Sequence, residues 1–164
     1  MSTRKDIILT QLRSCRDQDG WFAPLSVALR GLTAEQAAQN VGQPTNSIFG
    51  IVHHLVFWNE RYLRRFKDSS LPPLKMSNAE TFVKDLGEIV ESWDDLYQTL
   101  DNLFVQWEEA IIKCDDAKLD SRTHPDRDET WCTSLAHLAL HNAHHIGQIV
   151  HIRKELGIWE TWFE

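Results

Sequence analysis

The sequence predicts an all-α protein that folds as a four-helix bundle. Apolar residues recur at steps of three and four along four segments, which is the spacing of a helix buried on one face. Seven glycines and five prolines are few for 164 residues, as expected of a helix-rich chain, and no segment reads as a convincing strand. The length suits a single domain with one core, spanning residues 1–164. Four helices in such a chain pack most simply as a bundle.

The first predicted helix runs from about Lys5 to Arg16. Its apolar side carries Ile7, Ile8 and Leu12. A short helix follows within residues 21–30, and Gly31 is expected to break it. Thr33 then reads as the N-cap of another short helix, because acidic and amide side chains follow it in the first turn.

The second long helix is expected over residues 47–67, after a loop at 41–47. Its apolar side carries Ile48, Ile51, Val52, Leu55, Trp58, Tyr62 and Phe66. A loop with two prolines occupies residues 68–78, and a third long helix is predicted from about Ala79 to Ile112. That helix's apolar side carries Leu86, Val90, Trp93, Leu96, Leu100, Phe104 and Trp107. Residues 113–129 are polar and turn-rich, and the last helix is expected from about Thr130 to Leu156.

Charge and cysteine content exclude several classes of function. The formal net charge is −7, so no basic stripe is available to neutralise a nucleic-acid backbone. No apolar run is long enough for a signal peptide or a membrane span. The three cysteines, Cys15, Cys114 and Cys132, are widely spaced, which argues against a disulfide framework or a thiolate zinc site. We therefore expect a cytoplasmic protein with reduced thiols and no nucleic-acid or membrane partner.

Five of the eight histidines lie in the last predicted helix, between residues 137 and 151. His141 and His145 stand four residues apart, so they lie about 40° apart around the helix axis, one turn above the other. Such a pair can direct two ring nitrogens at one ion. On the helical wheel the pair lies at the border between the apolar stripe and a polar strip. His151 lies further toward the polar side and is expected to be solvated.

Three familiar metal sites do not match this pattern. A zinc protease needs a glutamate directly after the first histidine, and Asn142 stands there. A carboxylate-bridged di-iron site needs Glu-x-x-His, and no glutamate stands three residues before a histidine. A hemerythrin-like site fails because His151 and Glu155 share the helix and face about 120° away from His145.

A third ligand must come from another helix, where His53 and His54 are adjacent. His54 lies about 100° from the centre of that helix's apolar stripe and His53 about 160°. This geometry favours His54 as the inward residue and predicts His53 to be a solvated surface residue. Because His53 and His54 are adjacent, a shift of one residue in the helix register would exchange their roles.

Several segments resemble the DinB-like superfamily, which includes YfiT-type metal-dependent hydrolases and bacillithiol transferases. The resemblance is carried by "NSIFGIVHHLVFWNERYLRRF", by the His-x-x-x-His pair followed by Gly-Gln-Ile, and by "GLTAEQAAQ" ahead of "QPTNS". It spans nearly the whole chain. It implies a four-helix bundle of the DinB/YfiT-like type, frequently dimeric, with His54, His141 and His145 as ligands of one divalent metal ion, zinc or nickel.

The resemblance also implies a metal-dependent enzyme that acts on a small-molecule substrate, as a thiol S-transferase or a hydrolase, with a low-molecular-weight thiol as one substrate. The alternative is a non-catalytic metal-binding stress-response or interaction protein. Three neutral imidazoles leave a coordination position open, which suits Lewis-acid chemistry but does not select the metal. No general base is identified, although Asn142, Gln148 and Glu60 lie near the histidines in sequence.

The tryptophans are expected to divide between the core and the surface of the bundle. Trp58, Trp93 and Trp107 lie on apolar stripes and are predicted to be core residues. Trp21, Trp159 and Trp162 lie near segment ends, where they line a pocket mouth, form a dimer interface or pack the tail on the bundle. Together with Phe163, this apolar tail predicts a homodimer whose interface lies away from the pocket.

Overall fold

The computed structural model describes residues 2–42, 46–72, 74–82 and 92–160 of the chain. In order along the chain, its helices are α1 (Arg4–Arg16), α2 (Leu25–Ala28), α3 (Ala34–Ala38), α4 (Ile48–Lys67), the 3₁₀ helix η1 (Asn78–Thr81), α5 (Trp93–Lys113), α6 (Asp116–Asp120) and α7 (Trp131–Glu155). The described residues contain no β-strand, only one isolated bridge between Arg122 and Thr130. The all-α prediction is therefore confirmed.

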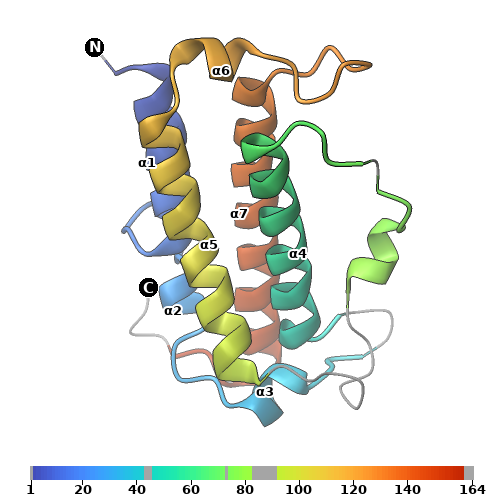
Figure 1. The fold of residues 1–164 in the computed structure, drawn as a ribbon. Helices are drawn as coiled ribbons and strands as arrows, with labels where there is room; N and C mark the ends of the chain where they lie inside the picture. The colour runs from blue at the N-terminus through green and yellow to red at the C-terminus, as the bar shows by residue number, and fades with distance from the viewer. Residues whose placement is uncertain (1, 43–45, 73, 83–91, 161–164) are drawn as a thin grey trace.

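The four long helices α1, α4, α5 and α7 form the predicted bundle (Figure 1). Each packs most closely on two others, so that α4 packs on α5 and α7, and α1 packs on α5 and α7. The short helices α2 and α3 lie near one end of the bundle and α6 near the other (Figure 1). This arrangement places α4 beside α7, the two helices that carry most of the histidines.

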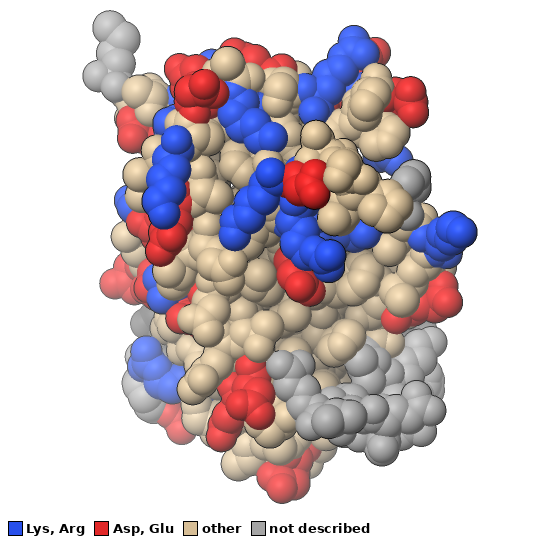
Figure 2. All heavy atoms as spheres, viewed as in Figure 1, with Lys and Arg blue, Asp and Glu red and all other residues tan. Residues whose placement is uncertain are grey.

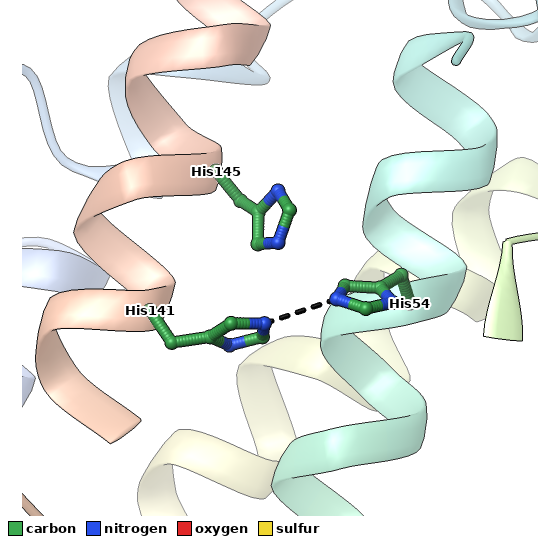
Figure 3. Close-up of side chains that lie close together, drawn as sticks. All are labelled: His54, His141 and His145. Atoms are coloured by element: carbon green, nitrogen blue, oxygen red, sulfur yellow. Dashed lines mark hydrogen bonds between the residues drawn. The ribbon is translucent and has the colours of Figure 1, made fainter. Parts of the chain in front are cut away.

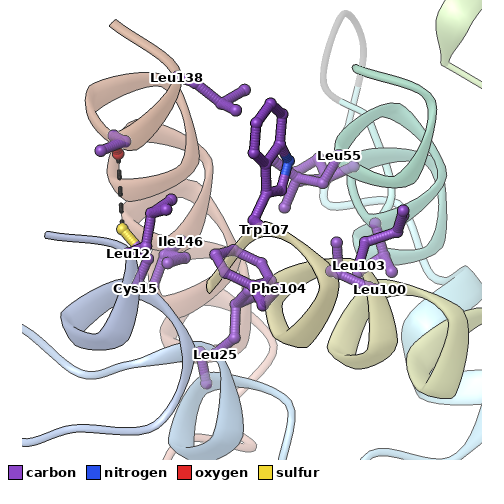
Figure 4. Packing of buried hydrophobic residues seen from close by; sticks show 14 of the residues in the cluster. Leu12, Cys15, Leu25, Leu55, Leu100, Leu103, Phe104, Trp107, Leu138 and Ile146 are labelled. Carbon is purple, nitrogen blue, oxygen red and sulfur yellow. Dashed lines mark hydrogen bonds between the residues drawn. The ribbon is translucent and has the colours of Figure 1, made fainter. Parts of the chain in front are cut away.

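The core lies along the axis of the bundle, where aliphatic and aromatic side chains from all four long helices meet (Figure 4). Trp107, on α5, is fully buried and lies close to Leu55 and Leu138 (Figure 4). Burial of such side chains contributes about 1.5–3 kcal/mol each. All three cysteines are free, and the Cys15 thiol points at the carbonyl of Ala139.

Local signals explain where most helices begin. Thr3, Ser47, Ser92 and Thr130 each accept a hydrogen bond from a backbone N–H in the first turn of the helix that follows. The predicted cap at Thr33 is confirmed and forms a reciprocal capping box with Gln36. The predicted break at Gly31 is also present, and its φ of 70° is a left-handed conformation that suits glycine.

The third long helix begins later than predicted. A continuous helix from Ala79 is wrong, because η1 ends at Thr81 and both Phe82 and Ser92 have extended backbone. The structure starts α5 at Trp93, where the Ser92 side chain caps the helix. Leu86 and Val90, which were assigned to this helix, lie outside the described residues.

Three smaller predictions also need correction. Ile7 was placed on the apolar side of the first helix, but it is exposed, and Leu9 and Cys15 are buried instead. The turn-rich segment 113–129 contains the short helix α6. Trp58 was predicted to lie in the core but is half-buried beside a cavity.

Among the described residues, no helix combines the length and apolar character needed to cross a bilayer.

Candidate metal centre

Three histidines from two neighbouring helices converge between α4 and α7 (Figure 3). His54 comes from α4, and His141 and His145 come from successive turns of α7. One ring nitrogen from each lies within 4.8 Å of the other two, and the Nε2 atoms of His54 and His141 are 3.0 Å apart. Within the described residues, no carboxylate or thiol joins this group. We call these three residues the histidine triad.

A buried pair of amides aligns α4 with α7 beside the triad. The Asn59 side chain donates to the Asn142 amide oxygen at 2.9 Å, and Asn142 donates back at 3.2 Å. Asn59 also donates to the carbonyl of Leu55. Both asparagines are fully buried, so an alternative register would leave amide groups without partners. This pair therefore helps to hold His54 opposite His141.

Thr81, at the end of η1, orients the His54 ring. The Thr81 hydroxyl donates its only proton to the carbonyl of Asn78, so it must accept from His54 Nδ1 at 2.6 Å. His54 therefore carries its proton on Nδ1 and directs the lone pair of Nε2 at the other histidines. Phe82 stacks on the same ring, with centroids 3.9 Å apart and planes 9° apart.

Gln148 orients His145 in the same manner. The Gln148 amide oxygen can only accept, so His145 Nδ1 donates to it across 2.7 Å. The Gln148 amide nitrogen in turn donates to His144 Nε2. His145 is thus left with its lone pair on Nε2. Partners of this kind set the tautomer and the orientation of histidines that bind metals.

The triad is uncharged at neutral pH. Burial, reinforced by the nearby histidines, lowers the pKa of His54 to about 3. Burial, followed by the charges of His145 and His144, lowers the pKa of His141 to about 4. Burial also lowers the pKa of His145, and the hydrogen bond to Gln148 opposes that shift. Neutral imidazoles are the form that binds metal, so a cation would displace no protons from the triad at pH 7.

These features fit a divalent metal ion. Nitrogens that share one zinc ion at about 2.0–2.1 Å lie roughly 3.3 Å apart, and the triad nitrogens are separated by 3.0 Å to at most 4.8 Å. His54 and His145 have lone pairs fixed toward the shared centre. The Nδ1 of His141 is buried and has no hydrogen-bond partner among the described residues, so its tautomer can follow the other two rings.

A cavity of about 240 Å³ adjoins the triad and is lined in part by His141. Trp58 and Tyr62 of α4 form an aromatic wall, and Leu138 of α7 adds an apolar side chain. His137 and Glu129, whose Nδ1 and Oε1 atoms are 3.5 Å apart, supply a polar lining. The cavity therefore offers a small molecule both apolar contact and hydrogen-bonding groups beside the triad.

The other histidines lie outside the triad. His53 is half-buried rather than solvated, because its Nδ1 donates to the backbone carbonyl of Thr81 at 3.2 Å. His151 is exposed, as predicted. The adjacent His53 and His54 thus contact the same threonine, but only His54 turns its free nitrogen toward α7.

The structure gives other roles to the three residues considered as a general base. Asn142 is locked against Asn59, and Gln148 holds His145. Glu60 is exposed and lines a separate hollow between α4 and α5. Thr81 and Phe82 were missed because they lie in the segment assigned to a long helix. Only the capping pattern Ser77–Glu80 marks a separate turn there.

Comparison with known proteins agrees with this geometry. The sequence model described as the DinB superfamily matches residues 23–149, which include α4, α5 and all three histidines of the triad. No curated protein and no solved structure matches the chain. A match over most of the chain, on an all-helical bundle with a histidine triad between two helices, shows that the chain belongs to the DinB superfamily.

Proposed function

We propose that His54, His141 and His145 bind one divalent metal ion, zinc or nickel, and that the protein is a metal-dependent enzyme. The observation that carries this proposal is the convergence of three uncharged imidazoles, two with their lone pairs fixed, beside a cavity. Membership of the DinB superfamily supports it. The bound ion would supply Lewis acidity for hydrolysis or for transfer of a thiol to an electrophile.

The chain's own residues would bind and orient the substrate. Trp58 and Tyr62 provide flat apolar surfaces against which a small molecule can pack. His137 is four residues before His141 and lines the same cavity, so its imidazole is available to accept or donate a proton there. Glu129 lines the same cavity, with its Oε1 atom 3.5 Å from His137 Nδ1.

Metal analysis of protein purified without a metal-affinity tag tests the site. We expect one equivalent of a divalent metal in the native protein and loss of that equivalent in His141→Ala, with helix content unchanged. His151→Ala, which removes an exposed histidine of the same helix, is the matched control and should keep the metal. His53→Ala should also keep it. Unchanged metal affinity in the variant with all three triad histidines replaced by alanine would refute the assignment.

Turnover separates the enzyme from the non-catalytic alternative. A screen of thiols with electrophiles and of hydrolysable esters and amides should give activity that disappears on chelation and returns with metal. In a cobalt-substituted sample, a millimolar thiol should shift the absorption spectrum if thiols are substrates. A metal that raises the melting temperature without any turnover would favour the alternative, a metal-binding stress-response or interaction protein.

We also propose that the protein forms a homodimer. The support is an apolar hollow of about 540 Å³ next to the fully exposed Trp21, lined by small and apolar residues of α7 such as Gly147 and Val150. Trp159 borders it and lies over Arg153 and Lys154 of the last turn of α7. Trp162 and Phe163 lie outside the described residues. Light scattering that gives a monomer at micromolar concentration would refute the dimer.

A further inference from the structure

A second cavity, of about 350 Å³, has a basic lining that contrasts with the charge of the chain. Arg61 and Arg65 of α4 and Arg127 of the α6–α7 connection line it, with Asp126 as the acidic residue of the set. Three guanidinium groups and one carboxylate leave a local charge of +2 in a chain whose formal net charge is −7. Figure 2 shows Lys and Arg side chains gathered over the half of α4 where this lining lies. We call this cavity the arginine pocket.

Asp126 offsets only one of the three positive charges of the arginine pocket, and none of its arginines forms an ion pair with a described carboxylate. Arg4, Arg13, Arg16 and Arg122 each form an ion pair with an aspartate or glutamate. Within the part of the chain that the structure describes, Arg61, Arg65 and Arg127 form none, and Arg61 donates instead to the carbonyl of Pro72 at 2.6 Å.

The Nε of Arg65 is buried and makes no hydrogen bond with the described residues. Burial, together with the charges of Arg65 and Arg64, lowers the pKa of Arg61. An anion in the pocket would therefore be attracted by guanidinium groups that form no ion pair with a described carboxylate.

The arginine pocket adjoins the cavity at the triad, because Tyr62 lines both. His54, Trp58 and Tyr62 follow one another at successive turns of α4, with ring centroids 6.3 and 6.0 Å apart. Arg65 stands eleven residues after His54, which is roughly 16 Å along the helix axis. One face of α4 thus leads from the triad, past two aromatic rings, to the arginines.

We propose that the arginine pocket binds the anionic end, a carboxylate or a phosphate, of the small molecule whose other end reacts at the triad. This inference rests on the proposed function and specifies its substrate class. Guanidinium groups bind both anions through two parallel hydrogen bonds. The substrate is then elongated, with its anionic group on the order of 10–15 Å from the reacting end, given the rise along α4.

Binding to metal-free protein tests the arginine pocket without reference to the metal. Isothermal titration calorimetry at low salt with inorganic phosphate and with glutarate should show saturable binding by one of them or both. Arg65→Gln and Arg127→Gln should each weaken it roughly tenfold, the usual effect of losing a charge-assisted hydrogen bond. Arg64→Gln is the matched control, because Arg64 is exposed, adjacent in sequence and absent from the lining.

Each outcome of that titration bears on the proposal. Binding of phosphate alone assigns a phosphate end, and binding of glutarate assigns a carboxylate end. Arg127 is exposed, so its variant tests the pocket even where Arg65→Gln disturbs α4. Absence of binding by either probe overturns the proposal, as does an equal loss of affinity in Arg64→Gln, which would indicate general attraction to a basic surface.

A length series then tests the link to the triad. Linear α,ω-dicarboxylates of increasing chain length should bind metal-free protein with similar affinity, because only one end is held. With one equivalent of zinc bound, the affinity should pass through a maximum at the chain that reaches from the triad to the arginines, and Arg127→Gln should remove that maximum. A flat series in zinc-loaded protein refutes the shared substrate, and failure to bind zinc refutes the proposed function instead.

Discussion

Removing both asparagines of the buried pair between α4 and α7 should destabilise the bundle far less than the sum of the two single removals. Asn59 and Asn142 are fully buried and exchange two hydrogen bonds, of 2.9 and 3.2 Å. Replacing Asn142 with leucine removes both bonds and leaves the Asn59 amide oxygen buried with no partner. Replacing both residues with leucine removes the bonds but leaves no unpaired amide.

The magnitudes follow from the burial. The two lost hydrogen bonds contribute about 1 kcal/mol each, and an unpaired buried acceptor costs about 1–3 kcal/mol more. Asn142→Leu should therefore lose about 3–5 kcal/mol of the free energy of unfolding. Asn59→Leu should lose more, because it also removes the hydrogen bond to the Leu55 carbonyl. The double variant should lose at least about 3 kcal/mol less than the sum of the two single variants, since the unpaired groups have gone.

Urea unfolding of the metal-free protein, followed by circular dichroism, measures all three variants on one scale. Asn102→Leu, at an exposed position of α5, is the control and should change stability little. A double variant that loses the full sum of the singles would refute the reasoning, because the two amides would then act independently. Metal affinity should fall with the single variants as well, since the pair aligns the helices that carry the triad.

Two further predictions concern the triad itself. Thr81→Val should weaken metal binding about 10–100-fold, because it removes the acceptor that holds His54, whereas Thr81→Ser should keep it; equal affinities of the two variants in a chelator competition would contradict this. The metal-free protein should lose stability as pH falls below about 6.5. The folded pKa values of His54 and His141 are lowered from 6.5 to about 3 and about 4, so the unfolded chain binds more protons in that range. Replacing His54 and His141 with glutamine should reduce the slope of the urea midpoint plotted against pH between 6.5 and 4. An unchanged slope would contradict the assignment of this pH dependence to the two histidines.

Much of the fold follows from patterns within a few residues. The spacing of apolar residues predicted all four long helices, and caps such as Thr33 and the break at Gly31 lie where expected. The start of α5 was missed, although Ser92 followed by Asp94 and Asp95 is itself a local N-cap signal. The apolar spacing on both sides of Ser92 is compatible with one helix, and it outweighed that signal in the prediction.

The candidate site was predicted only in part. The helical wheel identified His141 and His145 as a pair, because residues four apart on one helix are neighbours in any tertiary structure. It ranked His54 ahead of His53 by angle alone. The structure resolves their surroundings: both rings donate to Thr81, one to its carbonyl and one to its hydroxyl. Thr81 is 27 residues from His54 in sequence, and no pattern in the sequence connects them.

The sequence by itself thus determined that four long helices form, most of the residues on their apolar faces and the i, i+4 histidine pair, because these depend on interactions within one or two turns. Only the tertiary structure decided that α4 lies beside α7, that Thr81 and Gln148 set the tautomers of His54 and His145, and that the arginine pocket adjoins the triad. These features depend on packing between segments far apart in the chain, such as His54 and His141, which are 87 residues apart. A helical wheel gives the direction in which a side chain leaves its own helix. A site built from two helices also depends on where the second helix lies, which the wheel does not give.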